Sequence, residues 1–239
     1  MKVLVLYVFH IVNRRVIHFI NNAIFYDENI DFIVISNGKN KFNVPPYVKK
    51  MVRPNIGFDF GGWSDALLKD NLYFNYDYFI FVNSSVLGPF INNESERINW
   101  PYRYINGLKD NVKLFGSTIN TCLNPLNSSH VQSYIFAMEK TTLEFLIVGK
   151  IFSICNYAKT FNEAINRKEV LMSRKIIANG WNIGSLLPCY YGVDFRFIDK
   201  KPHNYNVTFM GDVMFKKYIG VFWTRNGLCF IKGNRMHIK

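Results

Sequence analysis

The sequence predicts an α/β fold in which helices cover a central, mostly parallel sheet. Short apolar runs suited to buried strands alternate along the chain with stretches of helical periodicity, and this alternation favours parallel strands joined by right-handed crossovers. Hydrophobic residues make up 49% of the 239 residues, which is enough to build a sizeable core. Because neither an internal repeat nor a low-complexity linker interrupts the chain, we expect a single domain over residues 1–239.

The first strand is expected at the N-terminus, where residues 3–9 (VLVLYVF) form a continuous apolar run typical of a strand buried on both faces. The run is too short for a signal peptide, and no small-residue cleavage site follows it. Apolar residues at helical spacing then predict a helix over 12–26. Further along the chain we expect strands at 32–36, 51–53, 78–82, 112–118 and 133–138, and helices at 63–69, 141–151 and 163–178.

The charge is strongly positive, +12, and is concentrated in two regions. Nine Lys and Arg but two Asp lie between Arg196 and the C-terminus, and a smaller cluster comprises Lys39, Lys41, Lys49 and Lys50. A basic protein attracts nucleic acids, anionic membranes or phosphorylated substrates. Neither cluster is a long basic run and no nucleic-acid-binding motif is present, so we expect no nucleic-acid partner, although a basic nucleic-acid-binding module stays an alternative. The basic segment 196–239 contains enough apolar residues to fold back over the sheet.

The cysteines indicate a reducing compartment. Cys122, Cys155, Cys189 and Cys229 are widely spaced without a C-x-x-C pair, which argues against a zinc cluster. Cys155 and Cys229 stand in apolar strings and are expected in the core. No apolar run approaches the roughly 18 residues of a membrane span. We therefore expect a cytoplasmic protein without a membrane span.

Two polar or glycine-rich segments follow predicted strands, where ligands of parallel sheets bind. In RPNIGFDFGGW (53–63), the glycines allow close backbone approach or positive φ, and the following helix N-terminus can face an anion. In NSSVLGPF (83–90), an amide and two hydroxyls follow an apolar strand. The structural alternatives are a capped strand–helix turn for the first segment and a polar strand exit for the second.

The order of these motifs resembles a known family. The segments R-x-N-x-G-x-D-x-G-G-W, N-S-S-V-x-G-P-F, L-F-G-S-T-I-N (114–120) and H-V-Q-S-Y-I-F-A-M (130–138) are similar to those of rhamnan-synthesis and related capsular or viral glycosyltransferases of the GT-A fold. The resemblance continues through Lys168-Glu169, Ser173-Arg174 and G-W-N-I (180–183) to F-I-K-G-N-R (230–235), and so covers about residues 1–235.

The resemblance implies a GT-A-like, Rossmann-like glycosyltransferase of viral or bacterial type, with a host-cytoplasmic location if viral. It would move a hexosyl or deoxyhexosyl group from a UDP-, GDP- or dTDP-sugar to a glycan acceptor, in polysaccharide or glycoprotein glycan synthesis. Residues 1–118 would form the nucleotide-sugar-binding half, and residues 119–239 the acceptor-binding half with the basic C-terminal segment. A catalytically inactive nucleotide-sugar- or glycan-binding domain is the alternative.

The resemblance also implies roles for particular residues. The donor-binding residues would be Phe9, His10, Ser36, Asn37, Arg53, Asn55, Gly57, Asp59, Asn83, Ser84, Lys232 and Arg235. Many GT-A enzymes carry a metal-binding D-x-D motif after the fourth strand, where this chain has Asn83-Ser84-Ser85. An amide and two hydroxyls suit Mn²⁺ or Mg²⁺ poorly. Two alternatives follow for the diphosphate: a divalent metal (Mn²⁺ or Mg²⁺) with Asp59 as a ligand, or, without a metal, neutralisation by cations such as Arg53, Lys232 or Arg235.

The reaction also needs a base and an acceptor site. Glu169 matches a recurring glutamate of the family and is the first choice for the base, with Glu139 as the alternative. Glu169 can equally be a solvated helix residue paired with a neighbouring cation such as Lys168. His130, Gln132 and Trp181 are the expected acceptor-binding residues, against the structural alternatives of an ordinary histidine and a core tryptophan.

Overall fold

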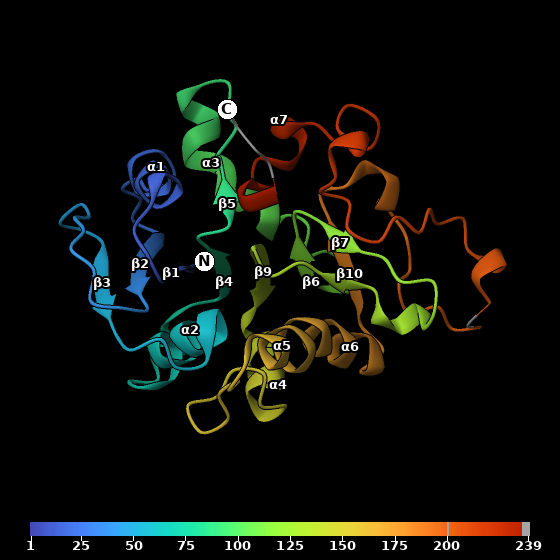
Figure 1. Cartoon of the computed structure of the whole chain (residues 1–239), viewed down its shortest axis with the longest axis horizontal. Coiled ribbons are helices and arrows are strands. Elements are labelled where there is room, and N and C mark those ends of the chain that lie inside the picture. Colours follow the sequence, from blue (N-terminus) through green and yellow to red (C-terminus); the bar gives the residue numbers. More distant parts are fainter. Residues whose placement is uncertain (200, 236–239) are drawn as a thin grey trace.

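A seven-stranded sheet forms the centre of the protein and carries helices on both faces (Figure 1). The computed structural model describes residues 1–199 and 201–235. The sheet has the order β10-β6-β9-β4-β1-β2-β3, and β9 alone among these strands runs antiparallel to its neighbours. The strands are β1 (Val3–Phe9), β2 (Ile30–Ser36), β3 (Lys49–Val52), β4 (Tyr78–Asn83), β6 (Val112–Gly116), β9 (Ile135–Glu139) and β10 (Asn182–Ser185). The predicted α/β class and mostly parallel sheet are confirmed.

The helices lie in two layers. Helices α1 (Arg14–Asn22) and α3 (Glu94–Ile105) pack on one face of the sheet. The other face carries α2 (Phe58–Leu68), α4 (Lys140–Val148) and α6 (Leu171–Ala178). Helix α5 (Phe161–Glu163) continues through a π-helix (Ala164–Val170) into α6, and α7 (Arg225–Leu228) lies in the C-terminal segment. No helix of the described residues is long and apolar enough to cross a membrane.

Strand β1 shows why its sequence is apolar throughout. Leu4, Leu6 and Val8 face the core beneath α2, whereas Tyr7 and Phe9 face the core beneath α1. Every residue of β1 is fully buried, because helices cover both faces of the sheet. The predicted strand at 3–9 is confirmed.

Helix α2 begins at Phe58, and not at 63 as the sequence predicts. Gly57 precedes it in the left-handed conformation, with φ +77°. Gly61 and Gly62 lie inside the helix because their missing side chains allow close packing. A Cβ on Gly61 would collide with the carbonyl oxygen of Ile56, and one on Gly62 would lie 2.8 Å from a methyl group of Val8. Gly62 therefore lets α2 pack closely on β1, Gly61 lets the preceding loop lie close to the helix, and Asp59 occupies the first turn of α2.

Helix α3 and strand β10 are not predicted by the sequence analysis. Asn93 caps α3 by accepting a hydrogen bond of 2.9 Å from the backbone N–H of Glu96, but Pro101 inside the helix hides its periodicity. The predicted burial of Cys155 is wrong, because its loop after α4 leaves the thiol exposed. Cys229 is buried, as predicted.

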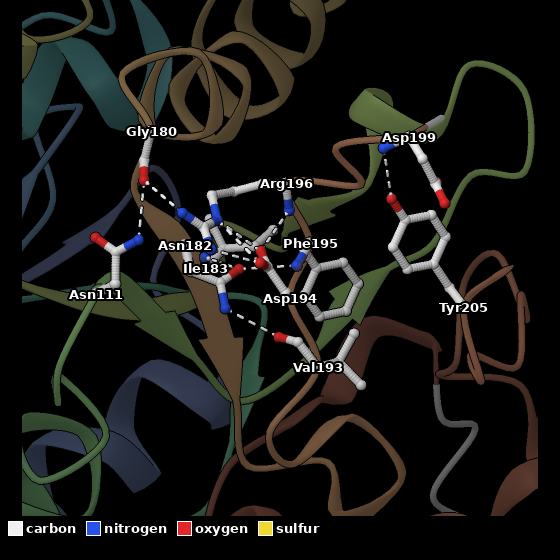
Figure 2. Close-up of polar contacts among 10 residues, drawn as sticks. All are labelled: Asn111, Gly180, Asn182, Ile183, Val193, Asp194, Phe195, Arg196, Asp199 and Tyr205. Atoms are coloured by element: carbon white, nitrogen blue, oxygen red, sulfur yellow. Dashed lines mark hydrogen bonds and ion pairs between the residues drawn. The ribbon is translucent and has the colours of Figure 1, made fainter. Parts of the chain in front are cut away.

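The described part of the C-terminal segment, residues 196–199 and 201–235, returns to the sheet, as predicted, and residues 236–239 lie outside the described residues. The chain directly before it is held to β10 by Asn182, whose side chain donates to the carbonyl of Val193 and accepts from the N–H of Phe195, each at 2.9 Å (Figure 2). Further on, β11 (Ile231–Lys232) pairs antiparallel with β5 (Val86–Leu87). A second short ribbon joins β7 (Ile119–Asn120) to β8 (His130–Val131). Residues 231–235 thus reach the carboxyl edge of the sheet.

Candidate functional site

A pocket of about 810 Å³ opens at the carboxyl ends of β1 and β4. Strand order reverses at this point, since β2 and β3 lie on one side of β1 and β4 lies on the other. Ligands of open α/β sheets bind at such switch points. The predicted site residues that line the pocket are His10, Asn55, Asp59, Asn83, His130, Gln132, Glu169, Lys232 and Arg235. They come from six separate parts of the chain, so the fold gathers most of the predicted site.

Asp59 presents its carboxyl group to the pocket from the first turn of α2. Burial raises the pKa of Asp59 to about 7, and the nearby carboxyl group of Glu169 also raises it. A hydrogen bond with Asn83 and the charge of His10 lower the pKa, but by less. The influence of Glu169 on Asp59 shows that the two carboxyl groups share one electrostatic environment. Asp59 therefore changes its protonation state near neutral pH.

The raised pKa of Asp59 predicts a pH-dependent effect on stability. The folded state holds this proton up to about pH 7, whereas the ordinary pKa is 3.8, so stability falls as pH rises from about 4 to about 7. We expect Asp59→Asn to raise the free energy of unfolding at pH 8, by about 1 kcal/mol or more after allowing for partial exposure, and to change it little at pH 4. Chemical denaturation at both pH values measures this. The exposed Asp70 provides the control, since the effect of Asp70→Asn on the free energy of unfolding should be the same at pH 8 and pH 4. Equal effects of the two variants at both pH values would contradict the prediction.

Asn83 holds the turn after β4 in place. The side-chain oxygen of Asn83 accepts from the N–H of Ser85 at 2.9 Å, and its amide donates to the carbonyl of Ser133 at 3.3 Å. Ser84 does not line the pocket, and its carbonyl accepts a hydrogen bond of 3.0 Å from Arg15. Within the described residues no three His, Cys, Asp or Glu side chains gather into a metal-binding group. The amide and hydroxyl groups of the turn after β4 fit a divalent cation poorly.

Two neighbours hold the side chain of Glu169 in the pocket. The hydroxyl of Ser133 donates to its Oε2 at 2.6 Å, and Nε2 of His130 lies 3.8 Å from its Oε1. The side chain of Glu169 is only 15% exposed. It projects from the π-helix, an irregular element that is frequent at functional sites.

The orientation of His130 is fixed from its other nitrogen. Nδ1 lies 2.8 Å from the carbonyl oxygen of Ser128, and because a carbonyl only accepts, Nδ1 must carry a hydrogen. A proton on Nε2 as well would therefore give an imidazolium facing the carboxylate of Glu169. His130, predicted to bind the acceptor, thus contacts the candidate base directly.

Lys168 fastens the π-helix to the loop after α4. Its ammonium donates to the carbonyls of Lys150, Ile151 and Asn156 at 2.7 to 2.9 Å, and burial lowers its pKa to about 8. The alternative that Glu169 is a solvated residue paired with Lys168 is therefore wrong. The two neighbours point in different directions, one into the loop and one into the pocket.

The basic C-terminal segment supplies the cations of the pocket. Lys232 lines it and forms no ion pair with another described residue. Arg235 lies 3.3 Å from Asp212, which also lines the pocket, so part of its charge is already balanced.

Arg53 has a structural position and does not line the pocket. Its guanidinium donates to Asp65 at 2.7 Å, to the side-chain oxygen of Asn37 at 2.7 Å and to the carbonyl of Ile56 at 2.7 Å. Both members of the Arg53–Asp65 pair are buried, with exposed side-chain fractions of 4% and 6%. The expectation that Arg53 meets a diphosphate conflicts with this geometry, because the guanidinium is buried and each of its three nitrogens already donates to a group inside the protein.

Other predicted donor-binding residues support the pocket from behind. Phe9, Ser36 and Asn37 are buried at the ends of β1 and β2, and Gly57 forms the turn before α2. Asn37 accepts from Arg53 and donates to the carbonyl of Phe58, which lines the pocket. These positions were found because they follow strands, but their side chains point into the protein.

Two further predictions fail on position. Glu139 pairs with Tyr78 in the sheet. Because β9 is antiparallel to β4, this places Glu139 at the amino end of β4, whereas Asn83 lies at the carboxyl end. There Glu139 forms an ion pair of 2.8 Å with Lys113. Glu139 is therefore excluded as a base for this pocket. Trp181 packs its ring against Phe145 and does not line the pocket either.

The sequence analysis missed several residues that line the pocket. Ser133, which holds Glu169, stands inside the quoted segment H-V-Q-S-Y-I-F-A-M but received no role. Asp212 and Phe161 belong to no motif, and only the fold brings them to the pocket. Asn120 ends the segment L-F-G-S-T-I-N, and its side-chain oxygen is buried without a hydrogen-bond partner among the described residues.

Comparison with known proteins identifies the family. No curated protein matches the chain at a significant level. The family model described as rhamnan synthesis protein F matches residues 33–230, which is most of the chain. The match begins inside β2, so it leaves out β1, and it includes the other strands of the sheet, the π-helix and the greater part of the C-terminal segment. The chain therefore belongs to the rhamnan synthesis protein F family.

Proposed function

We propose that the protein is a glycosyltransferase that moves a hexosyl or deoxyhexosyl group from a nucleotide-sugar to a glycan acceptor in polysaccharide synthesis. The observation that carries the proposal is one pocket, at the switch point of the sheet, that combines a positioned carboxylate with cations. Membership of the rhamnan synthesis protein F family supports the same activity. We also propose that the fold is of the GT-A type. The mostly parallel sheet and the position of the pocket support this proposal.

Each part of the proposed reaction has a residue suited to it. The carboxylate of Glu169 takes the proton of an acceptor hydroxyl as the hydroxyl oxygen attacks the anomeric carbon of the donor. The bond between that carbon and the diphosphate oxygen breaks, and its electron pair leaves with the diphosphate. Lys232 and Arg235 stabilise the negative charge that develops there. The hydrogen bond from Ser133 keeps the side chain of Glu169 in position before the acceptor binds.

Lys232→Ala should weaken donor binding and turnover together, because its charge meets the diphosphate in both the ground state and the transition state. Arg235→Ala should weaken binding too, partly by leaving the carboxylate of Asp212 unpaired. We expect losses of about tenfold for each, larger at low than at high ionic strength. Calorimetric titration with the donor at two salt concentrations measures them. The double variant Arg235→Ala/Asp212→Asn separates the lost cation from the exposed carboxylate, and unchanged binding in Lys232→Ala would contradict the assignment.

We expect divalent ions to contribute little to activity, because the turn after β4 carries an amide and two hydroxyls in place of carboxylates. Transfer rates in EDTA should stay within about threefold of those in Mn²⁺ or Mg²⁺ if the cations of the chain alone neutralise the diphosphate. Complete loss of transfer in EDTA, restored by Mn²⁺, would show that this prediction is wrong.

A thermal-shift screen tests the donor class directly. UDP-, GDP- and dTDP-sugars are compared with the corresponding nucleoside monophosphates and with inorganic diphosphate. A ligand at about 100 times its Kd stabilises the folded state by about 2.7 kcal/mol, and we expect at least one nucleotide-sugar to do so. Stabilisation by none of the nucleotide-sugars would contradict the proposal.

A further inference from the structure

Two phenylalanines form an aromatic surface on one side of the pocket. Phe161 lines the pocket and yet is 69% exposed. Its ring meets that of Phe58 edge to face, with the centroids 6.2 Å apart. Exposed rings inside a pocket are suited to pack against an apolar face of a ligand.

The position of Phe58 is fixed by a buried network. Its φ is +55°, in the left-handed region that costs energy for a residue with a side chain. The amide of Asn37 donates to its carbonyl at 2.9 Å, and Arg53 in turn donates to Asn37 at 2.7 Å. Interior contacts thus hold a strained backbone whose side chain forms part of the pocket wall.

Phe161 and the candidate base belong to one helical segment. Phe161, Ala164, Ile165 and Glu169 all line the pocket, at spacings that place them along one side of α5 and the π-helix. A ring that packs on Phe161 therefore lies beside the segment that presents Glu169. The cations come from a different part of the chain, because Lys232 and Arg235 belong to the C-terminal segment around β11.

Polar groups suited to hydroxyls accompany the aromatic surface. Asn120 pairs with His130 in the β7–β8 ribbon, and both line the pocket together with Glu169. The side-chain oxygen of Asn120, which has no hydrogen-bond partner within residues 1–199 and 201–235, needs a donor. A pyranose ring offers an apolar C–H face for stacking and hydroxyls for hydrogen bonds.

We infer that the Phe58–Phe161 surface is the acceptor subsite, where the terminal pyranose ring of the acceptor stacks and presents a hydroxyl to Glu169. This assignment rests on the proposed function. In this assignment Phe58 and Phe161, and not Trp181, are the aromatic residues that bind the acceptor. The acceptor side of the pocket is then distinct from the donor side, which carries Lys232 and Arg235.

Saccharide binding tests the assignment without requiring turnover. Ligand-observed NMR titrations use the methyl glycosides of L-rhamnose, D-glucose, D-galactose and D-mannose with the full chain. We expect at least one glycoside to bind the wild type, and Phe161→Ala to weaken it by about tenfold. Phe161→Tyr keeps the ring and should bind as the wild type does.

A matched control is Tyr26→Ala, which removes an equally exposed ring, 70% against 69%, that does not line the pocket. This variant should bind glycosides as the wild type does, and Phe161→Ala should keep its thermal shift with nucleotide-sugars. Binding of none of the glycosides to the wild type would overturn the inference. So would a Phe161→Ala variant that loses the nucleotide-sugar and keeps the glycoside, since the ring would then serve the donor. Glycoside binding through Phe161 without any nucleotide-sugar binding would contradict the proposed transfer and leave the saccharide subsite standing.

Discussion

Glu169→Gln should lower kcat by about 10² to 10⁴ while donor binding stays nearly unchanged. The amide keeps the shape of the side chain and can still accept from Ser133, which donates to the carboxylate at 2.6 Å. It cannot take the acceptor proton. Steady-state transfer rates, together with calorimetric titration of the donor, separate the two effects.

Glu139→Gln is the matched control for this change. Glu139 carries the same functional group and is also partly buried, with 28% of its side chain exposed, but it lies at the amino edge of β4. Its kcat should stay within about threefold of the wild-type value, the scale of an indirect effect. A Glu169→Gln variant with wild-type kcat would remove Glu169 as the base, and Asp59 would then be the carboxyl group to test.

Arg53→Met should destabilise the fold by about 3 to 5 kcal/mol, the usual consequence of removing one member of a buried ion pair. Asp65 would keep Tyr157 at 2.5 Å and Lys69 at 3.3 Å, but its strongest buried partner would be gone. The loop between β3 and α2 would also lose the hydrogen bond to Ile56. Chemical denaturation measures the loss of stability.

Arg167→Met controls for the general effect of removing an arginine. Arg167 is 74% exposed and pairs with Glu163 at 3.3 Å on the surface, so its loss should cost about 1 kcal/mol or less. The folded fraction of Arg53→Met should bind the donor within about threefold of the wild type, since Arg53 does not line the pocket. A stable Arg53→Met protein that no longer binds the donor would return Arg53 to the donor site.

The sequence predicts most strands of the sheet because buried strands must be apolar throughout. Strands covered on both faces need continuous apolar runs, and 3–9, 32–36 and 78–82 each supply one. The edge strand β10 is short and contains Gly184, so its segment carries no such pattern. Helix α3 is hidden for a different reason, because Pro101 interrupts its periodicity.

The candidate site is predicted only as far as local sequence decides it. The position after a strand identifies His10, Asp59 and Asn83, since carboxyl ends of parallel strands meet at one edge. The direction of a side chain depends on contacts made far along the chain. Arg53 turns inward because Asp65 lies there to receive it, and Glu139 moves to the far edge because β9 is antiparallel. The aromatic side of the pocket needs Phe58 and Phe161, which only the fold brings together.

Release of nucleoside diphosphate from a bound nucleotide-sugar tests the central claim most directly. The purified protein is incubated with each donor that stabilises it, with and without a glycoside that binds it, and the released diphosphate is followed by ³¹P NMR. We predict release by the wild type, faster with the glycoside than without it, and release reduced by about 10² to 10⁴ in Glu169→Gln. Donor binding by the wild type without any release of diphosphate would contradict the account and identify a nucleotide-sugar-binding domain that has no transferase activity.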